Sequence, residues 1–206
     1  MLDLLLVASL GVALYLVGSV PTAFVLVKWT KGVDLRESGT KNVGALNTFH
    51  HMGAWAGLLV LVADAAKGAL AVGAPIWAGL PDWAIFVTTP LVMAGHNWPV
   101  FLGFRGGKGA AAILGISLAL VPWLTLIALL PAALVALRLR NVVLGSAFGF
   151  VLVNTLLLAT RQSPQMVTLC ILLTILVTTT YLLAIREHVA VSVRTRQWRQ
   201  LFLRMA

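Results

Sequence analysis

Long apolar runs dominate the chain and alternate with short segments that hold most of the charged residues. The first run covers residues 4–27 and is long enough to cross a bilayer as a helix. Further runs cover residues 52–80, 83–95, 142–160 and 163–185. The pattern predicts an all-α integral membrane protein without a soluble domain, because only helices or closed barrels satisfy their backbone in lipid.

The run at residues 109–137 admits two interpretations. It is uncharged and contains Val121-Pro122 and Pro131. It crosses the membrane once, or it turns at Pro122 and crosses as two short helices, since proline interrupts helical hydrogen bonding. The first interpretation gives six spans and the second gives seven.

The distribution of Lys and Arg favours the turn. With seven spans, thirteen cations outside the spans fall on one side and only Arg161 falls on the other, whereas six spans give seven on each side. Cytoplasmic loops carry an excess of Lys and Arg. The sequence therefore predicts one polytopic domain over residues 1–206, with seven transmembrane helices, some short, the N-terminus outside and the C-terminus cytoplasmic. The basic tail 186–206 is expected along the anionic leaflet.

Composition agrees with this class, since 60% of the residues are hydrophobic and 10% are charged. The net charge of +9 follows from the positive-inside rule, so no nucleic-acid partner is expected. The single cysteine, Cys170, excludes a disulfide framework, and no cluster of metal ligands is present in the sequence.

Polar residues with candidate chemistry gather in the predicted cytoplasmic segments. Residues 33–47 hold Thr40, Lys41, Asn42 and Asn47 between small residues, which suits hydrogen bonding to a ligand. An ordinary polar turn that caps the next helix fits the same residues equally well.

Asp64 and Lys67 stand three positions apart on one helical face, inside an apolar run. A charge at the membrane centre costs roughly 2.5–3.5 kcal/mol on insertion scales, so such residues are usually functional or fix the fold. A role beside the site and a structural ion pair both fit.

Residues 95–109, GHNWPVFLGFRGGKG, form a glycine-rich basic turn between apolar runs. Gly106 and Gly107 free the backbone to direct N–H groups at an anion, while Arg105 and Lys108 add positive charge. The turn predicts a site for phosphate or a similar anion.

His96 lies where the third span reaches the interface, and Lys108 lies at the entry to the next helix, whose N-terminus also attracts anions. Ala110 follows Gly109, so the turn is not a nucleotide-binding P-loop.

Together these segments resemble the acyl-phosphate:glycerol-3-phosphate acyltransferase family, the PlsY family. The matching pieces occur in the family's order: Gly18-Ser19-Val20-Pro21, Asp34-Leu35-Arg36, Asp64-Ala65-Ala66-Lys67-Gly68 and residues 95–109.

The resemblance implies transfer of an acyl group from acyl phosphate to glycerol 3-phosphate, giving lysophosphatidic acid, at the cytoplasmic face of a bacterial plasma membrane. It implies no cofactor and no metal, and a monomer in the lipid bilayer is expected. The catalytic residues it implies are Lys108, His96 and Asn42. The substrate-binding residues it implies are Thr40, Lys41, Asn47, Gly106, Gly107, Arg105, Asp64, Lys67 and Ser146.

The sequence departs from the family pattern at several of these segments. The first-loop motif GSGNxGATN is altered at Thr40, Lys41 and Leu46, and His50 stands where an arginine is usual. The other departures are Val143 at a family serine, and Ile185 and His188 in the last motif. Two alternatives stay open: a diverged enzyme that acylates another phosphorylated polyol, and a non-catalytic membrane protein that binds phospholipid headgroups or transports an anion.

Overall fold

The computed structural model describes residues 1–195, with all side chains in that range except those of Ala184 and residues 187–195. Within this range every regular element is a helix, as the sequence predicts. Five helical segments are long and apolar enough to cross a membrane: Leu2–Lys31, Ala54–Trp77, Pro122–Leu139, Val142–Ala159 and Pro164–Leu183.

The described helices fall into two compact units, residues 1–120 and residues 121–206. The first unit contains α1 (Leu2–Ser19), α2 (Thr22–Lys31), α3 (Ala45–Met52), α4 (Ala54–Trp77), the 3-10 turn η1 (Asp82–Ala84), α5 (Ile85–Asn97), the 3-10 turn η2 (Val100–Leu102) and α6 (Ala110–Leu120). The second unit contains α7 (Pro122–Leu139), α8 (Val142–Ala159) and α9 (Pro164–Thr195).

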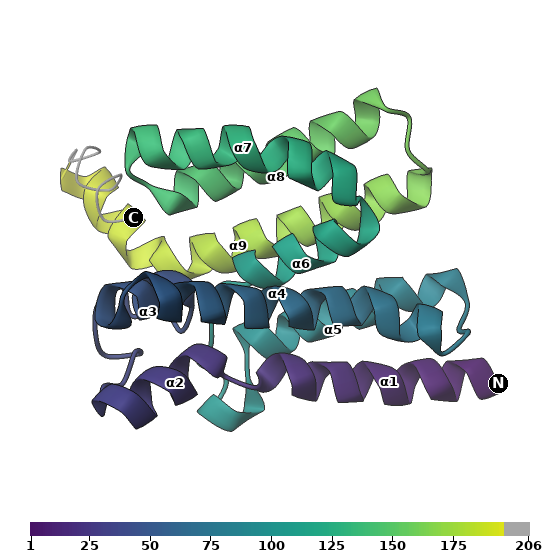
Figure 1. The fold of residues 1–206 in the computed structure, drawn as a ribbon, viewed down its shortest axis with the longest axis horizontal. Helices are drawn as coiled ribbons and strands as arrows, with labels where there is room; N and C mark the ends of the chain where they lie inside the picture. The colour runs from purple at the N-terminus through teal and green to yellow at the C-terminus, as the bar shows by residue number, and fades with distance from the viewer. Residues whose placement is uncertain (196–206) are drawn as a thin grey trace. The chain divides into compact units, whose positions relative to one another are not determined.

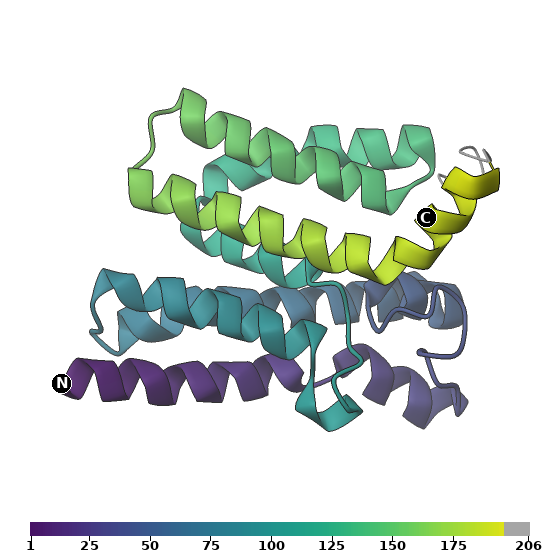
Figure 2. The ribbon, with the colours of Figure 1, turned by 180° about the vertical axis from the view of Figure 1, so that it is seen from behind.

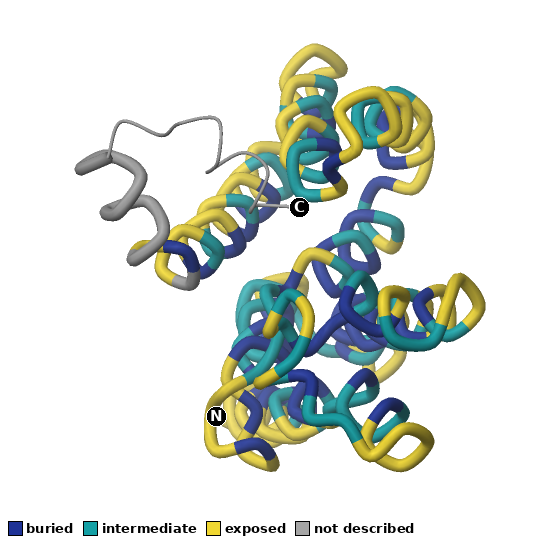
Figure 3. Tube along the Cα trace, turned by 90° about the vertical axis from the view of Figure 1, so that its left-hand side faces the viewer, coloured by how far each residue is buried: buried dark blue, intermediate teal, exposed yellow. Residues whose placement is uncertain are grey.

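In the first unit α1 packs along α5, and α4 packs along α6 (Figures 1 and 2). The crossing of α4 with α6 is close, since a side chain at Gly115 would collide with the carbonyl of Ala65. Small residues let helix backbones approach in this way in membranes. The segments 33–44 and 98–109 lie away from the N-terminal end of α1 (Figures 1 and 2), and each mixes buried and exposed residues along its length (Figure 3).

The span predicted over residues 4–27 falls within the apolar segment Leu2–Lys31, but it contains a break that the sequence analysis did not predict. The chain leaves the helix at Val20, which is extended at φ −63° and ψ 112°, and α2 begins at Thr22. Pro21 has no N–H to donate and disfavours the α conformation of the residue before it.

The run at residues 109–137 is two helices, as the interpretation with a turn requires. α6 ends at Leu120 and α7 begins at Pro122, with Val121 outside the α region at φ −139° and ψ 64°. α6 has 11 residues and α7 has 18, so the two halves are less equal than the sequence suggests.

In the second unit α7 packs along α8, and Asn154 on α8 donates a hydrogen bond to the Thr174 hydroxyl on α9 over 2.9 Å. Asn141 caps α8 by accepting from the backbone N–H of Leu144. α9 continues as a helix through Thr195, beyond the predicted end of the span at residue 185. The remainder of the predicted tail, residues 196–206, lies outside the described residues.

Candidate active site

The break between α1 and α2 leaves a backbone carbonyl without a helical partner, and a buried lysine bonds to it. Lys67 on α4 donates from Nζ to the Val20 carbonyl over 2.6 Å, to the Thr22 hydroxyl over 2.7 Å and to Asp64 Oδ1 over 2.7 Å. Asp64 is 2% exposed and Lys67 is 9% exposed. The ion pair between these two residues is present, and Lys67 also bonds to two acceptors at the break between α1 and α2.

Lys67 uses all three ammonium protons on protein acceptors. The Val20 carbonyl also accepts from the backbone N–H of Thr22 over 3.0 Å, so Lys67 gives this non-helical carbonyl a second, charged donor within an apolar segment. The geometry therefore gives Lys67 a structural reason to be buried, whichever substrate binds nearby.

His96, in the last turn of α5, lies between Asp64 and the glycine turn. Its Nδ1 is 3.8 Å from Asp64 Oδ1. Its Nε2 lies so close to Gly107 that a side chain there would collide with it. Glycine is required at residue 107 because the turn packs directly against the imidazole.

The N–H groups of the glycine turn bond to α5 instead of pointing at an open site. Gly106 donates to the Asn97 carbonyl over 3.2 Å, and Gly107 donates to the His96 carbonyl over 3.0 Å. The expectation that these two N–H groups face an anion is therefore wrong for this structure. Lys108 and the first turn of α6 follow the glycine turn, and a cation next to a helix N-terminus attracts an anion.

Lys108 lies between this turn and the start of α6 at Ala110. Gly109 has φ +81°, a left-handed conformation that lets the chain turn into the helix. Burial lowers the pKa of the Lys108 ammonium, because a low-dielectric environment disfavours the charged form. A bound anion would oppose that shift, because an opposite charge favours the charged form of the ammonium.

A pocket of about 220 Å³, including space open to solvent, lies where these segments meet. The α1–α2 break contributes Ser19 and Thr22, α4 contributes Asp64, and α5 contributes His96. The remaining wall includes Val43 of the first loop and the glycines at 106 and 107. Four predicted site residues, Asp64, His96, Gly106 and Gly107, thus line one cavity.

Asn47 organises the first loop from within. The side chain is 0% exposed. Its Oδ1 accepts from the backbone N–H of Thr40 over 3.1 Å, and its Nδ2 donates to the carbonyls of Leu35, Ser38 and Asn42. Asn47 shapes the loop that carries the other predicted binding residues.

The remaining predicted residues of this loop differ in their surroundings. Lys41 is exposed and has φ +55°, while Asn42 adjoins Val43 of the pocket wall. The Thr40 hydroxyl is buried without a hydrogen-bond partner among the described residues. His50, at the position of the usual arginine, is exposed beside Phe49.

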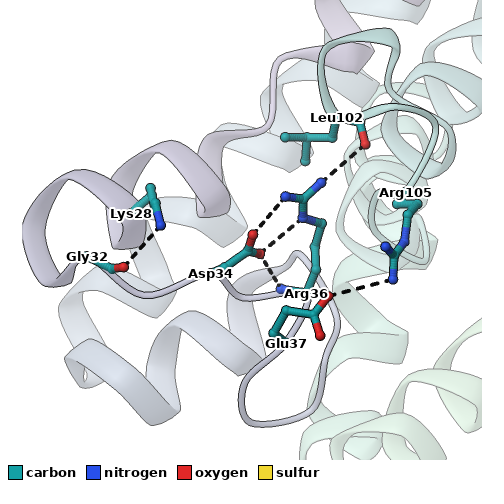
Figure 4. Close-up of polar contacts among 7 residues, drawn as sticks. All are labelled: Lys28, Gly32, Asp34, Arg36, Glu37, Leu102 and Arg105. Atoms are coloured by element: carbon teal, nitrogen blue, oxygen red, sulfur yellow. Dashed lines mark hydrogen bonds and ion pairs between the residues drawn. The ribbon is translucent and has the colours of Figure 1, made fainter.

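Arg105 and Ser146 do not lie in the pocket wall. Arg105 Nη2 lies 3.9 Å from Glu37 Oε1 of the first loop, and the two side chains are 69% and 70% exposed (Figure 4). Ser146 belongs to the second unit, where its hydroxyl donates to the Val142 carbonyl of the same helix. Neither geometry tests their predicted binding roles.

The sequence analysis did not predict two residues of this region. Thr22 accepts a hydrogen bond from Lys67 at the helix break, and Arg36 donates one to the Leu102 carbonyl in segment 98–109. Pro21 was a signal for the break that exposes Thr22, since proline inside an apolar run interrupts a helix. No group of three or more His, Cys, Asp and Glu gathers at metal-binding distance among the residues that the structure describes.

Comparisons with known proteins agree with this arrangement. The family model for glycerol-3-phosphate acyltransferase matches residues 8–191. A glycerol-3-phosphate acyltransferase of Synechococcus sp. (strain CC9902) is 35% identical over 178 residues, which are 86% of this chain and 87% of that relative. Glycerol-3-phosphate acyltransferase 4 of Dehalococcoides mccartyi (strain CBDB1) is 47% identical over 115 residues, which are 56% of this chain and 50% of that relative. The chain thus spans about half the length of the Dehalococcoides relatives that it matches.

Two solved structures share the fold. The glycerol 3-phosphate form of PlsY (YgiH), an integral membrane glycerol 3-phosphate acyltransferase, superposes with a TM-score of 0.80 at 31% identity and covers 92% of this chain and 93% of that chain. The lysophosphatidic acid form of the same protein gives a TM-score of 0.78 at 30% identity. Three of the four matching segments contribute residues to the pocket, and these likenesses show that the chain belongs to the glycerol-3-phosphate acyltransferase family.

Proposed function

We propose that the protein transfers an acyl group from acyl phosphate to glycerol 3-phosphate and releases lysophosphatidic acid and phosphate. The observation that carries this proposal is the pocket in which Asp64, His96 and the turn before Lys108 meet. The family match and the names of the related structures, a glycerol 3-phosphate form and a lysophosphatidic acid form, support it.

Acyl phosphate is an activated mixed anhydride, so the reaction needs no enzyme nucleophile. A hydroxyl oxygen of glycerol 3-phosphate attacks the acyl carbon, the bond from that carbon to the phosphate oxygen breaks, and phosphate leaves. The hydroxyl proton passes to a substrate phosphate, as the family resemblance implies. Lys108 and the start of α6 stabilise phosphate charge, while His96 and Asn42 position the reacting groups.

The membrane arrangement is part of the proposal. Seven spans, with the N-terminus outside, place the first loop and the glycine turn on the cytoplasmic side of a bacterial plasma membrane. The separation of α6 from α7 at Val121 supports the seven-span interpretation over six. The chain acts as a single polytopic domain, and no residue from a second copy is needed for the pocket described above.

The first test measures acyl transfer by the purified protein in detergent, with palmitoyl phosphate and glycerol 3-phosphate as substrates. We expect lysophosphatidic acid as the product, and we expect Lys108→Ala to lower kcat about 10²–10³-fold, the usual effect of removing one charge-stabilising donor. Lys31→Ala, at the exposed end of α2, is the matched control and should retain activity. Absence of product above the enzyme-free rate with the wild-type protein would refute the proposal.

A second acceptor is favoured by one observation. The loop that carries Thr40 and Lys41 departs from the family pattern, and His50 replaces the usual arginine. If the acceptor is a different phosphorylated polyol, a panel of such acceptors with one acyl phosphate donor will give a higher kcat/KM for that polyol than for glycerol 3-phosphate.

A further inference from the structure

The two loops that carry the predicted substrate residues are joined by an arginine. Loop 33–44 carries Asn42, and segment 98–109 carries Lys108, so the reaction requires that both loops keep a fixed separation. Arg36 in the first loop donates from Nη1 to the Leu102 carbonyl in the second, over 3.4 Å (Figure 4). These residues are 66 positions apart in the chain.

Arg36 is held in place by four further contacts, three of its guanidinium and one of its backbone N–H. Its Nε and Nη2 donate to the two carboxylate oxygens of Asp34 over 3.0 and 2.7 Å, and its own backbone N–H donates to Asp34 Oδ1 over 2.9 Å. Its Cζ lies 5.0 Å from the centre of the Phe24 ring on α2. A guanidinium can satisfy a carboxylate in this two-point geometry and still direct a third N–H elsewhere, which an ammonium cannot do.

Beneath this polar contact the same loops share an apolar core. Leu35, next to Arg36, is 0% exposed, and Leu102 is 8% exposed. Both belong to one buried cluster with Ala23, Val27, Val43 and Val60. The hydrogen bond from Arg36 therefore lies next to a packed apolar cluster. Protein interiors packed in this way shift little and transmit strain.

The loops meet again at the pocket. The Val43 carbonyl of the first loop lies against Gly107, since a Cβ at residue 107 would approach it to 2.9 Å. Val43 and Gly107 both line the pocket. The shared apolar core therefore connects the contact between Arg36 and Leu102 to the place where the two loops meet at the pocket.

We propose that Arg36, held by Asp34, is a positioning residue that fixes the distance between the two substrate-binding loops. This inference rests on the proposed acyl transfer. It predicts that loosening the Arg36 contact misaligns two bound substrates and slows their reaction more than it weakens the binding of either one, because transfer between substrates depends steeply on alignment.

The chain supplies a matched control in the same place. Glu37 and Arg105 also join the two loops, but their atoms are 3.9 Å apart and both side chains are mostly exposed. An exposed ion pair of this kind contributes little. Glu37→Gln should therefore leave both loop dynamics and activity unchanged, although it alters the residue next to Arg36.

The kinetic test compares Arg36→Lys, Asp34→Asn and Glu37→Gln in steady-state assays that vary each substrate. For Arg36→Lys and Asp34→Asn we expect kcat to fall about 10–100-fold while each KM changes less than threefold, and we expect Glu37→Gln to match the wild type. Added methylguanidine should restore part of kcat in Arg36→Ala. A rise in KM at constant kcat, or unchanged kinetics in Arg36→Lys, overturns the proposal.

Hydrogen exchange measured by mass spectrometry provides a readout that does not depend on activity. In Arg36→Lys, peptides from 34–44 and 98–108 should exchange faster, while the α5 peptide 85–93 and all peptides of Glu37→Gln should match the wild type. Equal exchange in Arg36→Lys and wild type overturns the proposal even if kcat falls. Faster exchange in Arg36→Lys than in the wild type, together with no acyl transfer by the wild type, supports the coupling of the loops and refutes only the proposed function.

Discussion

Lys67 and Asn47 each direct all their side-chain donors to other parts of the protein. Lys67 bonds to a backbone carbonyl, a hydroxyl and a carboxylate, and Asn47 bonds to three carbonyls of the loop that precedes it. Both residues therefore hold the backbone around the site in place, and their side-chain donors are already used within the protein.

Asp34 offers a direct measurement of the Arg36 contact. The hydrogen bonds from Arg36 hold the pKa of the Asp34 carboxyl at about 2, below its usual 3.8. Since the folded-state pKa is lowered, the stabilisation is complete above pH 3.8 and is lost as the pH falls through about 2. The contact is therefore expected to be constant across the physiological range.

The measurement is a carbon-13 titration of the Asp34 carboxyl in detergent micelles, assigned by loss of the signal in Asp34→Asn. We expect a midpoint near 2 in the wild type and a higher midpoint in Arg36→Lys, which loses the two-point contact. A wild-type midpoint at 3.8 would mean that the contact is absent in solution.

At the same scale, the sequence identified the residue types of the site but not their partners. An Asp and a Lys three positions apart inside an apolar run indicated a buried pair, and the pair exists. The Val20 carbonyl, 47 positions from Lys67, gives no signal in the sequence because every residue has a carbonyl. For the same reason, the bonds from Gly106 and Gly107 to α5 could not be predicted from their glycine content.

At the scale of the helices, the break between α1 and α2 is stabilised by one buried side chain, that of Lys67. Lys67→Met removes the cation that bonds to the Val20 carbonyl and leaves Asp64 buried without its charge partner. Breaking a buried ion pair from one side typically costs about 3–5 kcal/mol. We therefore expect a markedly lower melting temperature in detergent.

The control for this change is Lys28→Met. Lys28 is exposed at the end of α2 and donates to the Gly32 carbonyl, so its loss should change the free energy of unfolding by about 0.5 kcal/mol or less. If Lys67→Met melts with the wild type, then the bonds of Lys67 to the break do not stabilise the fold.

Helix boundaries illustrate which features of an element the sequence can reveal. The apolar run at residues 109–137 was divided at Pro122 because the charge distribution required it, and the helices end and begin there. No charge falls between residues 4 and 27, so the break at Pro21 had no comparable support. The short helix α3 was missed because its eight residues, ALNTFHHM, are too polar and too few for a span.

The largest scale concerns how the chain sits in a bilayer. Trp55 and Trp77 lie near the two ends of α4 and are 84% and 78% exposed. Their 22 positions correspond to about 33 Å of helix at 1.5 Å per residue, close to the ~30 Å of a hydrocarbon core. Exposed tryptophans at this spacing are typical of membrane interfaces. The spacing of Trp55 and Trp77 on α4 therefore matches the thickness of a bilayer core.

The predicted topology can be tested with single cysteines in a Cys170→Ala background. Seven spans place residue 37 in the cytoplasm and residue 162 outside. A membrane-impermeant maleimide should therefore label Gln162→Cys in intact cells, and it should label Glu37→Cys only in inverted membrane vesicles. Labelling of both variants from the same side would contradict the seven-span arrangement, although it would leave the family assignment intact.

The bond from Lys67 to the Val20 carbonyl also bears on biogenesis. A segment with an aspartate and a lysine near its middle enters a bilayer poorly by itself, since each charge adds a penalty of about 2.5–3.5 kcal/mol on insertion scales. Synthesis from the N-terminus delivers Val20 and Thr22 before α4 leaves the ribosome. We therefore expect the earlier segment to supply hydrogen-bond partners for Lys67 as α4 enters the bilayer, and a variant that misplaces Val20 and Thr22 should also insert α4 less efficiently.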